Sequence, residues 1–223
     1  MAIAARMKAP RAMVLDRVDS INAFACGWDD ESAVVAVTAG ALDLLTRDEL
    51  QGLVAHEFSH IREGDIRLNM RLAGMVLGLE MIFNLGSSMC EKTDGGHWSL
   101  LVVPGLAVKL AGSLGWLAGR LLIAAVSRQR EFLADARAVQ FTRSKEGLGG
   151  VLRKVADQQA HDGPGNPLHR SVQHLLLVDT ADGGRWFDSH PPLAERIRRI
   201  YGRPMASLPA RNRDQPTRPA AIF

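Results

Sequence analysis

Hydrophobic positions along the chain change their spacing several times, and each spacing predicts a different element. The run AVVAVT at 33–38 is short and β-branched and lies between turn-forming residues, which predicts a strand. Apolar residues then recur at helical spacing from 50 to 61. Thr46 followed by Glu49 is a capping box, so the sequence predicts a helix that begins after Thr46 and ends near Gly64.

Later segments are predicted from the same kind of pattern. Residues 127–141 are rich in alanine, arginine and leucine and predict a helix, whereas 157–170 contain glycine, proline and histidine and predict a loop. Residues 189–202 predict a helix started by proline. The first 20 residues show no clear element, and 203–223 have little apolar periodicity, which predicts a disordered tail rich in proline and arginine.

Two long apolar segments lie in the middle of the chain. Residues 72–90 hold one charge and 98–127 hold two, and a membrane-spanning helix needs about 20 apolar residues. Lys109 falls near the middle of the second segment, where a cation costs about 2.5–3.5 kcal/mol on insertion scales. A hydrophobic hairpin is therefore predicted, either buried in a soluble protein or placed in a membrane. Small residues four apart predict close helix contact at two pairs, Gly74 with Gly78 and Gly115 with Gly119.

Composition narrows the class of protein. With 223 residues, 47% hydrophobic and 23% charged, the chain is globular and large enough for a core of its own. The predicted fold class is mainly α with a small β-sheet. A net charge of +3 with interleaved signs and 5% aromatic residues argues against a nucleic-acid partner. Cys26 and Cys90 are too few for a disulfide framework.

The stretch HEFSH at 56–60 carries the first candidate chemistry. Four residues of an α-helix turn through about 400°, so His56 and His60 project within about 40° of each other and can reach one metal ion. Glu57 lies beside the pair, where it can act as a general base. The alternative is a polar helix face with two solvated imidazoles, and the five-residue pattern alone does not decide between them.

A hydrolytic zinc ion needs a third protein ligand. Glu131 is a candidate because Asp135 follows four residues later on a predicted helix, so that one helix can supply a ligand and a carboxylate that orients a ligand histidine. The alternative is surface ion pairing with the neighbouring arginines at 128, 130 and 137.

Four stretches in order resemble the HtpX-type membrane zinc metallopeptidases, a family that also contains the CAAX prenyl proteases. They are INAFACG (21–27), the segment from VVAVTAG to HEFSHIREGD (34–65), SRQREFLADARAV (127–139) and SHPPLAERIRRI (189–200). The resemblance implies a zincin-type (gluzincin) metallopeptidase domain at 1–202. A hydrophobic helical hairpin would be inserted at about 68–126, and the tail would follow at 203–223.

The resemblance also implies a site. His56, His60 and Glu131 would bind one zinc ion, and Glu57 would be the general base. Asp135 would hydrogen-bond one of the ligand histidines, without an indication of which one.

Further roles implied by the resemblance concern the substrate. His190 and Arg196 would lie near the oxyanion. Asn22 and the strand at 33–38 would line the cleft and hold the substrate backbone as an added strand, the predicted substrate-binding residues being Asn22, Ala33, Val34, Val35 and Ala36. Cys26 stands where the family usually has a small residue, and it is interpreted as a packing residue.

The expected activity is that of a zinc-dependent endopeptidase that hydrolyses peptide bonds with metal-activated water. Its partners would be polypeptides, in particular misfolded or membrane proteins. The protein would be located in a bacterial-type inner membrane, with its active site on the cytoplasmic side. Three alternatives stay open: a soluble cytoplasmic protease whose hairpin is buried in a dimer, a non-catalytic membrane scaffold, and a helical interaction domain with an incidental HExxH. The sequence leaves the oligomeric state undetermined.

Overall fold

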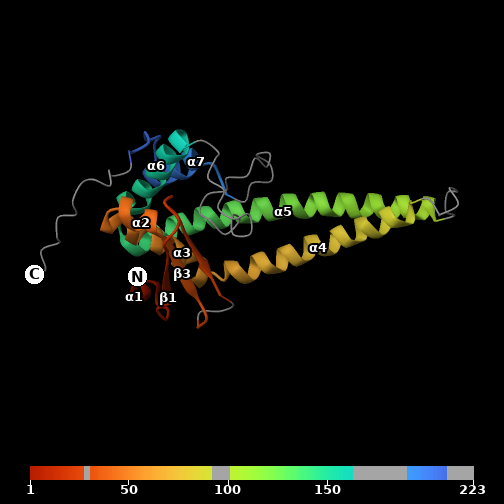
Figure 1. Cartoon of the computed structure of the whole chain (residues 1–223), viewed down its shortest axis with the longest axis horizontal. Coiled ribbons are helices and arrows are strands. Elements are labelled where there is room, and N and C mark those ends of the chain that lie inside the picture. The colour runs from red at the N-terminus through yellow and green to blue at the C-terminus, as the bar shows by residue number, and fades with distance from the viewer. Residues whose placement is uncertain (28–30, 92–100, 163–189, 210–223) are drawn as a thin grey trace, which may run out of the picture. The chain divides into compact units, whose positions relative to one another are not determined.

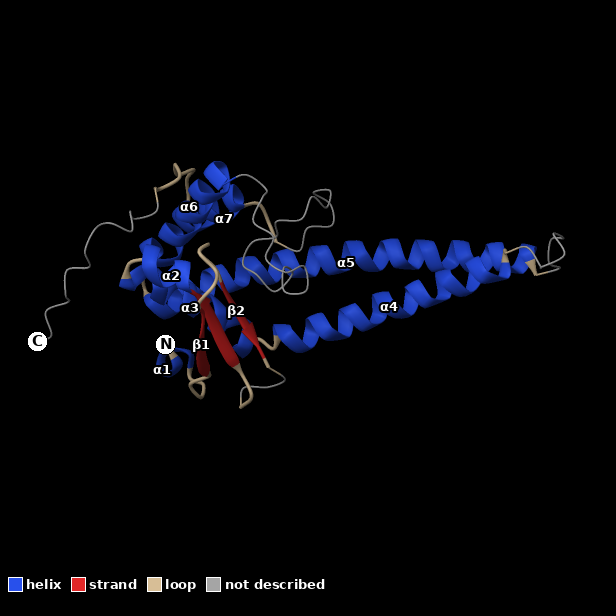
Figure 2. Ribbon diagram, viewed as in Figure 1, coloured by secondary structure: helices blue, strands red, loops and turns tan. Residues whose placement is uncertain are grey.

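The computed structural model of the chain describes residues 1–27, 31–91, 101–162 and 190–209. Helices dominate this part of the chain, and three strands form one small sheet (Figure 2), as the predicted fold class requires. In chain order the elements in Figure 1 are α1 (Ala2–Ala5), β1 (Arg11–Leu15), β2 (Ala23–Cys26), β3 (Val34–Thr38), α2 (Ala39–Leu44), α3 (Arg47–Arg62), α4 (Asp65–Met89), α5 (Val102–Thr142), α6 (Lys145–Asp162) and α7 (Leu193–Tyr201).

The described residues form two compact units. The first comprises residues 1–65, 130–162 and 190–209, and the second comprises 66–129. The chain passes from one unit to the other at the start of α4 and within α5. The predicted helix at 127–141 is therefore the last part of a much longer helix, α5.

The sheet of the first unit has the strand order β1-β3-β2. Its central strand, β3, confirms the strand predicted at 33–38. It pairs with β1 in parallel and with β2 in antiparallel orientation. The two flanking strands were not predicted, because they are four or five residues long and β1 is mostly exposed, so neither has the alternation of a half-buried strand.

The pairing of β3 corrects one prediction about the substrate. Every residue of β3 has a partner in β1, and Val34 to Val37 also have partners in β2. A strand that is hydrogen-bonded on both sides has no free edge to which a peptide can be added. The prediction that Val34, Val35 and Ala36 hold the substrate as an added strand is therefore wrong. Ala33 lies just before β3, and its role toward a substrate stays a prediction.

Helix α3 begins where the sequence predicts. Thr46 Oγ1 accepts a hydrogen bond from the Glu49 backbone N–H (3.3 Å), and Glu49 Oε2 accepts one from the Thr46 N–H (2.7 Å). This capping box satisfies two of the N–H groups that a helix start leaves open. Apolar side chains bury α3 on two sides: Phe58 packs with Val35 of the sheet, and Ala55 lies in a cluster with side chains of α6 and α7.

Helix α6, which the sequence analysis missed, lies against α3. Gly52 allows the close approach, since a Cβ there would overlap the backbone nitrogen of Leu148. Lys154 Nζ, nearly buried, donates to Glu49 Oε2 (2.7 Å) and to the Leu44 carbonyl (3.0 Å), which connects α6 to the start of α3. The loop predicted at 157–170 is wrong as far as Asp162, and its remaining residues lie outside the described part.

The last described helix, α7, confirms the predicted helix over Leu193–Tyr201 and is followed by Gly202, whose φ of 76° suits glycine. The chain continues against α6 beyond this point. Arg153 Nε donates to the Ala206 carbonyl (2.6 Å), and the Leu208 N–H donates to the Arg153 carbonyl (3.2 Å). The prediction of a disordered tail from 203 is therefore wrong for its first residues, and 210–223 lie outside the described part.

The second unit consists of α4 and the first part of α5, which run side by side in Figure 1. Both helices are long and apolar enough to cross a membrane, and few of their most apolar residues are buried. Large apolar side chains are exposed along both helices, among them Met75, Leu77, Met81, Leu85, Val103, Leu106, Leu110 and Leu114.

Glycines do form the contact between these two helices, but not all of the predicted ones. Gly115 and Gly119 face Leu79 and Val76, as expected, whereas Gly74 and Gly78 have no neighbouring atom within 4 Å. The closest approaches are instead at Gly86, Gly105 and Gly112.

Candidate metal centre

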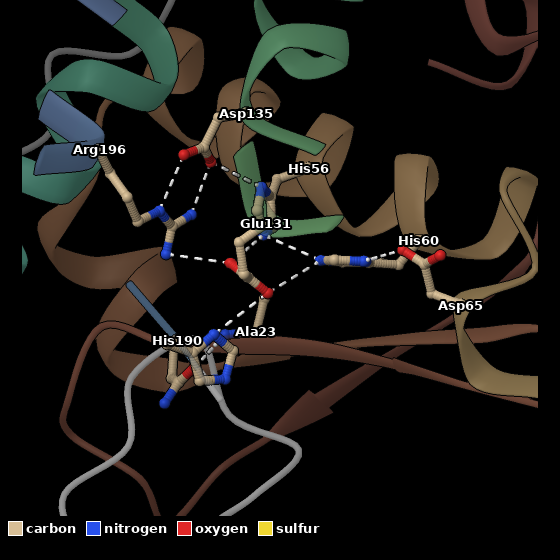
Figure 3. A network of polar contacts seen from close by, with 9 residues as sticks. Ala23, His56, His60, Asp65, Glu131, Asp135, His190 and Arg196 are labelled. Atoms are coloured by element: carbon tan, nitrogen blue, oxygen red, sulfur yellow. Dashed lines mark hydrogen bonds and ion pairs between the residues drawn. The ribbon is translucent and has the colours of Figure 1, made fainter. Parts of the chain in front are cut away.

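His56 and His60 project from adjacent turns of α3 toward one point, as their spacing predicts. Their Nε2 atoms lie 3.1 Å apart, and their rings meet nearly at right angles (Figure 3). His56 is fully buried, whereas the His60 side chain is 17% exposed. The pair therefore borders the surface on the His60 side only.

Glu131 of α5 completes a group of three ligand atoms. Its Oε2 lies 3.5 Å from His56 Nε2, and its Oε1 lies 3.5 Å from His60 Nε2. One ligand atom from each of the three residues lies within 4.8 Å of the other two. These are the three residues that the sequence analysis named as metal ligands.

Each of the two histidines has a carboxylate beside its Nδ1 atom, on the side of the ring away from Nε2. His56 Nδ1 lies 3.1 Å from Asp135 Oδ1, and His60 Nδ1 lies 2.7 Å from Asp65 Oδ2. A carboxylate accepts a hydrogen, so each imidazole directs its Nδ1–H at a carboxylate and turns Nε2, the atom that can bind a metal ion, toward the other ligand atoms. Asp135 was predicted to hydrogen-bond one of the ligand histidines; the histidine beside it is His56, and its role toward a metal ligand stays a prediction.

An arginine in turn holds each of these two carboxylates. Arg196, fully buried on α7, donates from Nε and Nη2 to the Asp135 carboxylate (2.9 and 2.6 Å), and its Nη1 lies 3.2 Å from Glu131 Oε2. Arg130 pairs with Asp65 and also donates to the Glu63 carbonyl (2.7 Å). The site thus contains two His–Asp–Arg chains, which are His56–Asp135–Arg196 and His60–Asp65–Arg130.

Charges around the three ligand atoms favour a cation at their centre. Burial would lower the pKa of His56, but hydrogen bonds with Asp135 and Glu131 outweigh it and raise the pKa to about 10. Burial would raise the pKa of Glu131, yet Arg196 and the histidines hold it well below its usual range. Arg196 likewise keeps the pKa of Asp135 low against the effect of burial. Ionised carboxylates therefore surround the two imidazoles.

The donor set fits a divalent metal ion. Two Nε2 lone pairs that face each other at 3.1 Å repel, unless a proton or a metal ion lies between them. The buried Glu131 Oε2 lies 3.2 Å from Arg196 Nη1 and 3.5 Å from His56 Nε2 but has hydrogen-bond geometry with neither. Two imidazoles with one carboxylate, each imidazole backed by a second carboxylate, are the ligands that zinc prefers in hydrolytic sites. The three residues can therefore hold such an ion without rearrangement of the partners behind them.

The predicted general base and oxyanion residues have different surroundings. Glu57 is buried next to His56 and forms no ion pair within the described residues, which leaves its carboxylate available. His190 is 18% exposed, and its Nδ1 lies 3.1 Å from Glu131 Oε1. Arg196 has no exposed surface, and its contacts are with Glu131 and Asp135. Its role near the oxyanion stays a prediction, and these contacts position the two carboxylates.

One site residue was missed from the sequence. Asp65 follows His60 by five residues, beyond the end of α3, so helical spacing gives no signal for it.

Asn22, predicted to bind substrate, is nearly buried. Its Oδ1 accepts a hydrogen bond from the Ala23 N–H (2.8 Å), and its backbone N–H donates to Thr38 Oγ1 (3.0 Å). Its role toward a substrate stays a prediction.

Comparison with known proteins decides which family has this arrangement. The family model described as peptidase family M48 matches residues 1–203. The chain belongs to peptidase family M48. It is a metallopeptidase, and the cluster of His56, His60 and Glu131 is where this peptidase can bind its metal.

Individual relatives agree with this assignment. The peptidase is 37% identical over 210 residues to a protease HtpX homolog of Ligilactobacillus salivarius, and the match covers 90% of this chain and 69% of the relative. It is 38% identical over 208 residues to a protease HtpX homolog of Dictyoglomus thermophilum, covering 90% and 65%. The fold is similar to the crystal structure of S. mikatae Ste24p, with a TM-score of 0.53, 21% identity, and coverage of 84% of this chain and 44% of that chain.

Proposed function

We propose that the peptidase is a zinc-dependent endopeptidase with a zincin-type (gluzincin) site, in which His56, His60 and Glu131 bind one zinc ion. The observation that carries this proposal is the convergence of two Nε2 lone pairs and a carboxylate, with a carboxylate behind each imidazole. When bound, zinc supplies a Lewis acid that activates water and polarises a carbonyl group.

The residues around the ligands have complementary tasks. Glu57 takes the proton of the attacking water and returns it to the leaving amine. It is suited to this because its carboxylate forms no ion pair with any residue that the structure describes. In this proposal His190 donates a hydrogen bond to the oxygen that gains charge, which its partly exposed position beside Glu131 supports. Arg196 and Asp135 keep Glu131 and His56 in position from the buried side.

A substrate backbone can pair only with an edge of the sheet. Because β3 lies in the centre, the edges within the described residues are β1 and β2. We infer that the substrate adds to β2, since this strand directly follows Asn22 and α3, which carries the histidines, lies against it. Pairing of this kind gives affinity through the main chain and little sequence specificity, which suits an enzyme that acts on many polypeptides.

The natural setting that we propose is membrane protein quality control. Two observations support it: the relatives are named protease HtpX homologs, and both helices of the second unit expose apolar side chains. The substrates would be misfolded or membrane polypeptides. The peptidase would lie in a bacterial-type inner membrane with its active site on the cytoplasmic side.

A cleavage assay with metal analysis tests the catalytic proposal. The purified chain should contain one zinc ion and cleave casein, and a chelator should abolish cleavage until zinc is restored. Glu57→Gln should keep the zinc and lower turnover by about 10²–10⁴-fold, because the base is lost while the ligands stay. Glu31→Gln, at an exposed carboxylate, is the matched control and should cleave normally.

Two results would contradict this proposal. Full cleavage by the Glu57→Gln variant would exclude Glu57 as the base. Cleavage that survives complete removal of metal would exclude a metallopeptidase mechanism and would leave the two histidines as structural residues.

A further inference from the structure

A second polar site lies in the first unit, apart from the metal ligands. It is a pocket of about 690 Å³ formed by the ends of three helices, α1, α3 and α5. Half of its lining residues are arginines and none is acidic: Ala4, Arg6, Arg62, Arg137, Val139, Gln140, Phe141 and Arg143.

Nearby negative charge balances only part of the positive charge of the four arginines in this arginine pocket. Arg137 lies 3.4 Å from Glu63, whereas Arg6, Arg62 and Arg143 are exposed and form no ion pair within the described residues. The C-terminal ends of the three helices contribute at most about half a negative charge each. After Glu63 and the helix ends are subtracted, the four arginines leave a surplus of about 1.5 positive charges. Capping of helix ends therefore accounts for only part of this cluster.

Neighbouring side chains orient two of the guanidinium groups. The Arg62 guanidinium carbon lies 5.7 Å from the centre of the Phe141 ring, and Arg137 Nη1 donates to Gln140 Oε1 (3.3 Å). A guanidinium held over a ring keeps its N–H donors at the edge, where they can bind a planar or tetrahedral anion in two places. This arrangement reduces the side-chain entropy that binding would otherwise cost.

The backbone at two of the arginines is also unusual. Arg6 and Arg143 both have a φ of 53°, and within the described residues no other non-glycine residue has a positive φ. This conformation costs most residues about 1–2 kcal/mol, and at helix ends it is usually taken by glycine or asparagine. Two positions that favour glycine thus carry arginine, and both line the same pocket.

We propose that the arginine pocket binds the phosphate group of an organic phosphate ester. Four guanidinium groups suit a phosphate better than a carboxylate, since a phosphate offers more oxygens and more charge. The pocket is larger than a bare phosphate needs, and Ala4, Val139 and Phe141 give it an apolar part for the organic group. Two sources share this chemistry, a soluble phosphate ester and an anionic phospholipid headgroup.

Binding to the full chain in neutral detergent tests the proposal. The probes are glycerol 3-phosphate and phosphatidylglycerol, with phosphatidylcholine as the lipid of neutral headgroup, and native mass spectrometry counts the bound molecules. The pocket variant is Arg62→Gln with Arg143→Gln. The matched control is Arg17→Gln with Arg47→Gln, which removes the same charge from exposed positions outside the pocket. Zinc content and helicity of each variant report on its fold.

The native chain should bind phosphatidylglycerol in preference to phosphatidylcholine. The pocket variant should weaken this binding about tenfold or more, because two charge-assisted hydrogen-bonding groups are lost, while the control variant changes it less than twofold. An equal effect on glycerol 3-phosphate would assign a soluble ester as a ligand, and an effect on the lipid alone would assign the headgroup. Equal weakening by both variants, or no binding of either anionic probe by the native chain, would overturn the proposal. These readouts do not require peptidase activity.

Discussion

Asp65 and Asp135 serve two different histidines, and their surroundings differ. Asp135 and its partner Arg196 are buried, so this chain of contacts is screened from water. The Arg130 partner of Asp65 is 26% exposed, and Asp65 itself is the first residue of α4. We therefore expect His60 to be the more easily disturbed of the two ligands.

Replacement of Asp65 tests the role that the structure gives it. Asp65→Asn should lower zinc affinity by about 10–100-fold, because the carboxylate that fixes the proton on His60 Nδ1 is lost. Competition with a metal-sensitive dye measures the affinity. Asp43→Asn, an exposed carboxylate on α2, is the control. Unchanged affinity in Asp65→Asn would mean that Asp65 does not orient a metal ligand.

Protons should leave the site when zinc binds. The pKa of His56 rises from 6.5 to about 10, so in the metal-free chain this imidazole carries a second proton at pH 7. A zinc ligand must be neutral imidazole, and binding at pH 7 should therefore release about one proton per ion. Zinc titration in weak buffer with a pH indicator measures this release, which should fall to about half a proton per ion at pH 10. No release at pH 7 would contradict the charge assigned to His56.

The same pKa shift sets the pH dependence of stability without metal. A pKa raised in the folded state stabilises the fold below the ordinary value of 6.5, and the contribution is lost as the pH rises to about 10. The metal-free chain should accordingly lose stability across this range, and zinc should restore it.

At the scale of elements, local sequence signals were enough to predict α3, whereas the sheet depends on pairing between strands that are apart in the sequence. The capping box and the apolar spacing specify α3 within a few residues, which is why His56 and His60 could be placed on one face. Strands β1 and β2 depend on pairing with β3, and nothing within their own few residues shows that pairing. The error about the substrate strand followed, because the sequence did not show that β3 has neighbours on both sides.

Glycines of the hairpin provide a test at the same scale. A Cβ at Gly112 would lie 2.5 Å from the Phe83 backbone nitrogen, whereas Gly78 has open space around it. Gly112→Ala should therefore destabilise the second unit by about 1–3 kcal/mol, as overpacking does. Gly78→Ala should be neutral or stabilise the helix by up to about 1 kcal/mol. Thermal unfolding in detergent, followed by helicity, compares the two. Equal effects would mean that α4 and α5 do not meet at Gly112.

At the scale of the whole molecule, the site joins residues that are far apart in sequence. Glu131 follows His60 by 71 residues, and the intervening segment forms the second unit. Spacing made Glu131 and Asp135 candidates but left them open to an ordinary surface ion pair, and the resemblance to a family favoured the site. The fold brings them to α3 because α5 re-enters the first unit just before Glu131.

The apolar surface of the second unit allows a test between a membrane peptidase and the soluble alternative. Its two helices have 6% and 17% of their most apolar windows buried, so a single chain leaves most of this apolar surface uncovered. A contiguous exposed surface of this kind needs either lipid or a second protein surface.

In the membrane case the chain should float with phospholipid vesicles and stay with them in high salt, because ions screen surface charge but do not weaken apolar insertion. In the soluble case it should sediment as a stable dimer without detergent, with an interface of at least about 1,200 Å². We expect flotation, and a monodisperse dimer in plain buffer that ignores vesicles would overturn the membrane assignment while leaving the metal centre intact.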